Sequence, residues 1–138
     1  MPFARALLAR NPGFGVIGLV PCAYGGSKIA EWQPGKYLYE ELIKRAKAAM
    51  KSGGELKGLL WLQGGADSTK KEGAESYKAN LVNFFSRVRF DLNSPDLLII
   101  QVLTITDLHF HDSNFSLLIW FFPPYQFTFC YVESQARI

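Results

Sequence analysis

Three short apolar runs, separated by two stretches with helical periodicity, constrain the fold of this chain more than any other feature. The runs are Val16–Val20, Leu56–Leu62 and Leu97–Leu103. Apolar runs of this length are typical of strands that are buried on both faces of a sheet. Strands that alternate with helices form a parallel sheet through right-handed crossovers. The sequence therefore predicts a layered α/β fold with a parallel sheet.

The two stretches between the runs have the pattern of amphipathic helices. From Tyr37 to Met50, apolar residues recur at helical spacing, while charged residues occupy the other side. The glycines that follow can end that helix without a steric penalty. A second helix is expected from about Glu72 to Leu92, and Asn93-Ser94-Pro95 ends it. The first ten residues have the spacing of a further short amphipathic helix.

Composition places the chain among small globular domains. It has 138 residues, of which 49% are hydrophobic and 20% charged, so one domain is expected and wholesale disorder is excluded. The net charge of +3 comes from interleaved charges, which does not favour nucleic acid or an anionic membrane as a partner. The two cysteines, Cys22 and Cys130, suggest neither a disulfide framework nor a zinc site. No metal and no cofactor are expected.

Neither end of the chain has the pattern of a targeting or membrane segment. The first ten residues contain Arg5 and Arg10 and no long apolar core, so they are not a secretory signal, and a cytoplasmic location is favoured. The uncharged stretch Ser113–Val132 has about the length of a membrane span, but Pro123 and Pro124 interrupt it. We therefore do not expect this chain to cross a membrane.

The composition changes near residue 107. Almost half of the aromatic residues lie between Phe110 and Tyr131, and no charged residue occurs between Asp112 and Glu133. Three interpretations are open for residues 107–138: a segment that binds a partner or touches a membrane, a strand-rich addition that completes the domain, or sequence foreign to the fold. We favour the third, because an exposed tail this apolar would promote aggregation. The predicted domain therefore spans residues 1–106.

Two loops follow predicted strands at the carboxyl edge of the sheet, where folds of this type place their functional groups. The first loop, Cys22–Trp32, contains Gly25 and Gly26, which either bind a developing negative charge through their N–H groups or form only a tight turn. The second loop, Gln63–Thr69, begins with a glutamine that needs a partner at the end of a buried strand. Its amide either donates to an oxyanion or bonds to neighbouring backbone. Asp67 is expected to cap the following helix.

Several blocks of the chain stand in an order that is typical of one protein family. They are Gly18–Ala23, Gly25–Ile29, Glu31-Trp32, Gly58–Gly64 and Asp67. Together these blocks resemble the plant carbohydrate esterases of the sialate O-acetylesterase-like branch of the SGNH hydrolases. The resemblance covers about residues 1–102. It implies a flavodoxin-like, three-layer α/β/α sandwich, incomplete at both ends of this chain, and metal-independent hydrolysis of acetyl esters on sugars.

The resemblance also implies roles for residues in the two loops. The backbone N–H of Gly25 or Gly26 and the side-chain amide of Gln63 would contribute to an oxyanion hole. The residues expected to contact the substrate, an O-acetylated carbohydrate or a small ester, are Ser27, Trp32 and Gly64. In the family, a serine in a Gly-Gln-Ser-Asn block is the nucleophile, and an Asp-x-x-His pair activates it.

The chain departs from the family pattern at these catalytic blocks. No Gly-Gln-Ser-Asn block occurs in it, and Gly65 occupies the position of a family glutamate. Asp107, His109 and His111 have suitable chemistry at the wrong spacing, so we interpret them as coincidental. We therefore expect an incomplete esterase domain that retains part of the oxyanion hole. The alternative is an inactive pseudoenzyme, or a module that binds carbohydrate or protein; the oligomeric state is left open.

Overall fold

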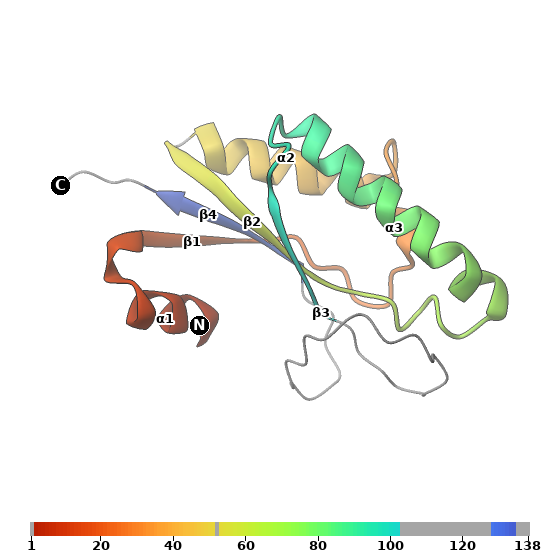
Figure 1. Cartoon of the computed structure of the whole chain (residues 1–138). Helices are drawn as coiled ribbons and strands as arrows, with labels where there is room; N and C mark the ends of the chain where they lie inside the picture. The colour runs from red at the N-terminus through yellow and green to blue at the C-terminus, as the bar shows by residue number, and fades with distance from the viewer. Residues whose placement is uncertain (1, 52, 103–127, 135–138) are drawn as a thin grey trace.

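The computed structural model describes residues 2–51, 53–102 and 128–134 as a mixed α/β fold (Figure 1). Its elements are α1 (Pro2–Arg10), η1 (Pro12–Phe14), β1 (Val16–Pro21), η2 (Ile29–Trp32), α2 (Tyr37–Lys51), β2 (Gly54–Leu62), α3 (Lys71–Asp91), β3 (Leu98–Val102) and β4 (Thr128–Ser134). The three apolar runs are β1, β2 and β3, and the two amphipathic stretches are α2 and α3. The strands and helices predicted from periodicity are thus confirmed.

The two long helices form because each places an apolar stripe on one side. Helix α2 buries Tyr39, Leu42, Ile43 and Ala46, and α3 buries Leu81, Phe84 and Val88. These spacings of three and four residues keep each stripe on one face of its helix. Helix α3 ends where Leu92 N–H bonds to the carbonyl of Val88, and Asn93 then takes a positive φ of 51°.

The sheet has four strands in the order β1-β4-β2-β3. β2 and β3 are parallel, as expected, with Gly58 opposite Leu98 and Leu62 opposite Val102. β4 lies between β1 and β2 and runs antiparallel to both. The three predicted strands, β1, β2 and β3, therefore run in the same direction, as expected, and β4 adds an antiparallel strand between two of them. The connection through α2 places β1 and β2 two strand positions apart in the sheet, and β4 occupies the position between them.

Helices α2 and α3 lie over the same face of the sheet (Figure 1). An aromatic cluster joins them to β2 and η2: the Trp61 and Phe84 rings are 4.5 Å apart, and Trp32 meets Trp61 edge-on at 5.1 Å. Such large, fully buried rings dominate the energetics of a core this size. Helix α1 lies beside the start of β1, away from α2 and α3 (Figure 1). In terms of the expected three-layer sandwich, α2 and α3 both belong to the same helical layer, on one face of the sheet.

The aromatic C-terminal part of the chain is only partly within the described residues. Thr128–Ser134 forms β4, whereas the predicted boundary at residues 106–107 and both histidines, His109 and His111, fall outside the described ranges. In the described part of the chain, no helix combines the length and apolar character needed to cross a membrane. The uncharged stretch of about membrane-span length lies outside the described residues, except that its last five residues, 128–132, belong to β4.

Candidate functional site

The candidate site lies where the first and second loops meet beyond the carboxyl ends of β1 and β2. The loops belong to strands separated by β4, yet side chains of the second loop contact the backbone of the first. In α/β folds ligands bind at this edge of the sheet. The geometry of the two loops therefore decides what chemistry the site can support.

Asp67 is the residue that joins the two loops most directly. Its two carboxylate oxygens, Oδ1 and Oδ2, accept from the backbone N–H of Ile29 at 3.2 and 3.1 Å, and the residue is only 5% exposed. Ile29 begins the short helix η2, so its N–H has no partner inside that helix. The predicted role of Asp67 as the cap of the next helix is wrong, because α3 begins at Lys71 with Lys70 as its N-cap. Asp67 serves the start of η2 instead.

Gln63 has the partners that a buried amide at a strand end requires. Its Nε2 donates to the carbonyl of Ser27 at 2.8 Å and to Asp67 Oδ2 at 2.6 Å, and the residue is 3% exposed. The carbonyl oxygen of Ser27 and the carboxylate of Asp67 are both acceptors, so the amide nitrogen of Gln63, and not its oxygen, faces them. Within the described residues, Oε1 has no hydrogen-bond partner. For Gln63 to donate to an oxyanion, one of its two present bonds must be released; that role stays a prediction.

Ser27 and Trp32 form the buried support of the first loop. Ser27 Oγ donates to the carbonyl of Tyr24 at 2.9 Å and accepts from Trp32 Nε1 at 2.9 Å. Both residues are almost fully buried. Their burial argues against the predicted direct contact with substrate, because neither side chain reaches the surface of the loop. We assign them instead to holding the loop in shape.

The glycines of the two loops differ in what they offer. Gly25 and Gly26 are exposed, and within the described residues no hydrogen bond occupies their N–H groups. Gly26 has a φ of +74°, which a glycine adopts without strain. Gly64 has a φ of +134°, and a Cβ there would lie 3.4 Å from the hydroxyl of Tyr77. Gly64 thus lets the second loop pass close to α3, and its predicted contact with substrate stays a prediction.

Tyr77 of α3 supports the second loop from outside. Its hydroxyl donates to the carbonyl of Gln63 at 3.0 Å. Burial raises the pKa of Tyr77, so the hydroxyl keeps its proton and remains a donor at neutral pH. Trp61 lies in β2, two positions before Gln63, and its side chain is completely buried. Neither residue was singled out from the sequence for this site, since each matches the apolar stripe of its element.

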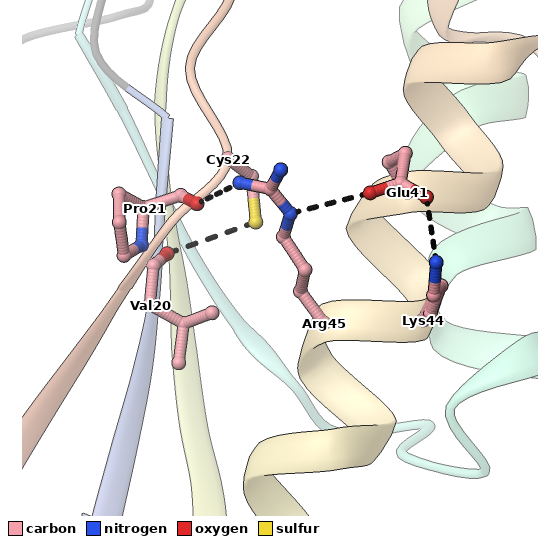
Figure 2. A network of polar contacts seen from close by, with 6 residues as sticks. All are labelled: Val20, Pro21, Cys22, Glu41, Lys44 and Arg45. Carbon is pink, nitrogen blue, oxygen red and sulfur yellow. Dashed lines mark hydrogen bonds and ion pairs between the residues drawn. The ribbon is translucent and has the colours of Figure 1, made fainter.

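At the end of β1 a polar network ties the start of the first loop to α2 (Figure 2). Arg45 Nη1 donates to the carbonyl of Pro21 at 2.8 Å, and Arg45 Nε lies 3.5 Å from Glu41 Oε2. The hydrogen bond from Lys44 lowers the pKa of Glu41, so the carboxylate stays ionised beside Arg45. Figure 2 also shows Cys22, whose Sγ lies 3.7 Å from the carbonyl oxygen of Val20 and whose side chain is buried as a small apolar residue.

Each serine and threonine hydroxyl described in the two loops donates to a backbone carbonyl and not to a side-chain base. Ser27 Oγ is buried and bonded, and Ser68 Oγ donates to the carbonyl of Gly65 at 2.9 Å. The part of the chain described by the structure also contains no group of three or more His, Cys, Asp or Glu side chains that could hold a metal. What the two loops do offer is a pair of exposed glycines, followed in the chain by Ser27, whose carbonyl accepts from the buried amide of Gln63.

Comparison with known proteins identifies the class to which this fold and these loops belong. A family model described as carbohydrate esterase, sialic acid-specific acetylesterase, matches residues 1–117, so the chain belongs to this family of ester hydrolases. The resemblance inferred from the sequence blocks is thereby confirmed. The matched range runs past the boundary predicted at residue 106 and ends before β4.

Two comparisons with a protein of Arabidopsis thaliana place the chain more narrowly. It is 48% identical over 103 residues to the probable carbohydrate esterase At4g34215, in a match that covers 74% of this chain and 40% of that protein. The X-ray structure of At4g34215 matches with a TM-score of 0.57 and 46% identity, over 58% of this chain and 34% of that one. The chain therefore spans well under half the length of the relative that it matches. Its α/β fold is that of part of this relative.

Proposed function

We propose that this chain takes part in the hydrolysis of O-acetyl esters of carbohydrates, and that its two loops hold the carbonyl oxygen of the acetyl group. One observation carries the proposal: the exposed Gly25–Gly26 turn is tied to Gln63 through the carbonyl of Ser27, 2.8 Å from the amide nitrogen. A rigid donor turn of this kind stabilises the oxyanion that forms when a nucleophile adds to an ester carbonyl. Membership of a carbohydrate esterase family supports the substrate class.

In this proposal the loop residues have separate roles. The N–H groups of Gly25 and Gly26 donate to the oxyanion, while Asp67 and Gln63 hold the first loop at a fixed distance from the end of β2. Gln63 itself joins the donors only if it exchanges its bond to Ser27 or Asp67 for one to the substrate. The nucleophilic serine and the Asp-His pair, which the family resemblance implies, are not among the described loop residues.

A second candidate is a module that binds acetylated carbohydrate without hydrolysing it. The bonded state of Ser27 and Ser68 favours it, because neither hydroxyl stands beside a base. Both candidates require the same anion-binding turn. They differ in whether this chain releases acetate from an ester.

Titration of the 138-residue chain with sodium acetate, followed by the backbone amide signals of Gly25 and Gly26, tests the shared requirement. We expect saturable shifts that weaken in Gln63→Ala, because the turn loses the side chain that bonds to Ser27. The matched control is Ser68→Ala, which removes an exposed hydroxyl from the same loop. Absence of any acetate-dependent shift in the folded parent chain would overturn both candidates.

Hydrolysis of p-nitrophenyl acetate then separates the two candidates. Turnover by the parent chain that falls in Gln63→Ala and not in Ser68→Ala supports the esterase proposal, because the donors of the Gly25–Gly26 turn then depend on the bond between Gln63 and Ser27 for their position. Acetate binding without turnover supports the binding module and overturns hydrolysis by this chain.

A further inference from the structure

A cleft of about 450 Å³ opens beside the first loop, between that loop and the start of α2. It is lined by Tyr24, Ala30, Glu31, Lys36, Tyr37 and Leu38. Tyr24 and Tyr37 are 58% and 72% exposed, so neither ring contributes much to the core. Large aromatic side chains grouped on a surface often mark a place where a ligand binds. The packing of the fold gives no reason for two such rings at one cleft.

Two charged side chains give the same cleft an acceptor and a donor. Glu31 Oε2 accepts from the backbone N–H of Lys28 at 2.7 Å, which holds the carboxylate in place and leaves Oε1 unengaged within the described residues. The ammonium group of Lys36 forms no hydrogen bond or ion pair with any residue that the structure describes. The cleft therefore combines exposed rings with one fixed acceptor and one cationic donor.

The cleft adjoins the turn that is proposed to hold the acetyl oxygen. Tyr24 directly precedes Gly25, and Glu31 lies in η2, whose first N–H is bonded by Asp67. When the carbonyl oxygen of the ester lies at the turn, the alcohol part of the ester would lie beside the two tyrosines. A sugar ring suits these neighbours, because its C–H face packs on aromatic rings and its hydroxyls both donate and accept hydrogen bonds.

We propose that this cleft binds a sugar ring of the carbohydrate, with Tyr24 and Tyr37 contacting its apolar face and Glu31 and Lys36 bonding to its hydroxyls. The inference rests on the proposed function, which it extends from the acetyl group to the sugar. It makes Tyr24 and Tyr37 residues that determine specificity, and it does not involve them in the chemical step.

Binding of unacetylated oligosaccharides tests this subsite separately from ester hydrolysis. Cellotetraose and maltotetraose are titrated into the full chain, and affinity is measured by calorimetry and by amide shifts in the first loop. We expect Tyr24→Ala and Tyr37→Ala each to weaken binding about fivefold, in line with the loss of one aromatic contact. Tyr24→Phe and Tyr37→Phe keep the ring and are expected to stay within about twofold of the parent chain.

Phe90→Ala is the matched control, because Phe90 is an equally exposed aromatic residue on α3, outside the cleft. Both tyrosines are exposed, so their substitution leaves the core intact, and a thermal melt verifies this for each variant. Loss of affinity confined to the two Tyr→Ala variants supports the proposal. Equal affinity in all variants, or no binding of either oligosaccharide to the folded parent, overturns it.

The same titrations distinguish failure of this subsite from failure of the esterase proposal. Oligosaccharide binding that depends on the tyrosines, in a chain that never hydrolyses an acetyl ester, sustains the sugar subsite and overturns the hydrolytic role. The opposite result is a chain that hydrolyses p-nitrophenyl acetate, an ester without a sugar, but binds neither oligosaccharide. That result sustains the hydrolytic role and overturns the sugar subsite.

Discussion

The hydroxyl of Tyr39 on α2 donates to the carboxylate of Asp91 at the end of α3, and this bond ties together the two helices that cover the sheet. Tyr39 is buried, and Asp91 also lies 3.6 Å from Arg87. The two residues thus form a charge-assisted hydrogen bond at the edge of the aromatic core, where the ring of Tyr39 contacts Phe84.

Replacement of Tyr39 by phenylalanine is expected to lower the free energy of unfolding by about 1.5 kcal/mol, because it removes one hydrogen bond to a charged group and keeps the ring. Urea unfolding followed by tryptophan fluorescence measures the change. Tyr37→Phe is the matched control, since Tyr37 is exposed at the start of the same helix and should leave stability unchanged. Equal stability of the two variants would show that the bond to Asp91 does not stabilise the fold.

Stability should fall at alkaline pH. Burial, with the hydrogen bond to Asp91 as the next cause, raises the pKa of Tyr39, and burial raises that of Tyr77, above the ordinary value of 10.0. A group whose pKa is higher in the folded state stabilises the fold fully below its unfolded pKa and loses that contribution as the pH rises through the folded pKa. We expect the thermal midpoint to decline from about pH 10 upward, and less steeply in Tyr39→Phe. Parallel declines in parent and variant would contradict this assignment.

Asp67→Asn should disturb the junction of the two loops. Asp67 Oδ2 accepts from both the N–H of Ile29 and the amide of Gln63, so the asparagine oxygen keeps these bonds only as a neutral acceptor. The new NH₂ group then stands where Oδ1 now accepts from Ile29, so a buried donor faces a donor. The expected cost is about 2 kcal/mol of unfolding free energy. Urea unfolding measures it, and near-UV circular dichroism should report the change around Trp32. Ser68→Ala, one position along, serves as the control and should change stability by less than about 0.5 kcal/mol.

A proline in the middle of β4 should disrupt the sheet. β4 pairs with β1 on one side and with β2 on the other, so Tyr131→Pro removes a donor from a strand that has no free edge. We expect most of that variant to be insoluble on expression. Thr128→Pro, at the first residue of the same strand, should remain soluble, because strands tolerate proline at that position. Comparable yields of soluble protein from both variants would argue that β4 is dispensable.

Local periodicity was sufficient to predict the elements but not all of their arrangement. Helix α2 and strand β2 follow from patterns within a few residues, and the structure has them close to where the sequence placed them. β4 could not be predicted in this way, since its partners lie in β1 and β2, far away in the sequence. The sequence that leads into β4 is uncharged from Ser113 to Val132, so it gives no alternation of apolar and charged residues that would mark one face of a strand.

The site was predicted in its components and not in its contacts. Gln63 was expected to need a partner, but the identity of that partner depends on which loop lies across from it in space. Its bond to Ser27 spans 36 positions, and the bond from Ile29 to Asp67 spans 38. Asp67 was assigned to the nearer helix because capping rules consider only adjacent residues, and the more distant start of η2 takes its carboxylate instead.

The reversed direction of β4 also determines where the intervening chain enters the molecule. Thr128 stands opposite Trp61, and Val102 stands opposite Leu62, so both anchor points of residues 103–127 lie on the rim that bears the first and second loops. The two ends of an insertion introduced into that interval would therefore be attached beside the rim that bears these two loops, and not at the opposite end of the sheet.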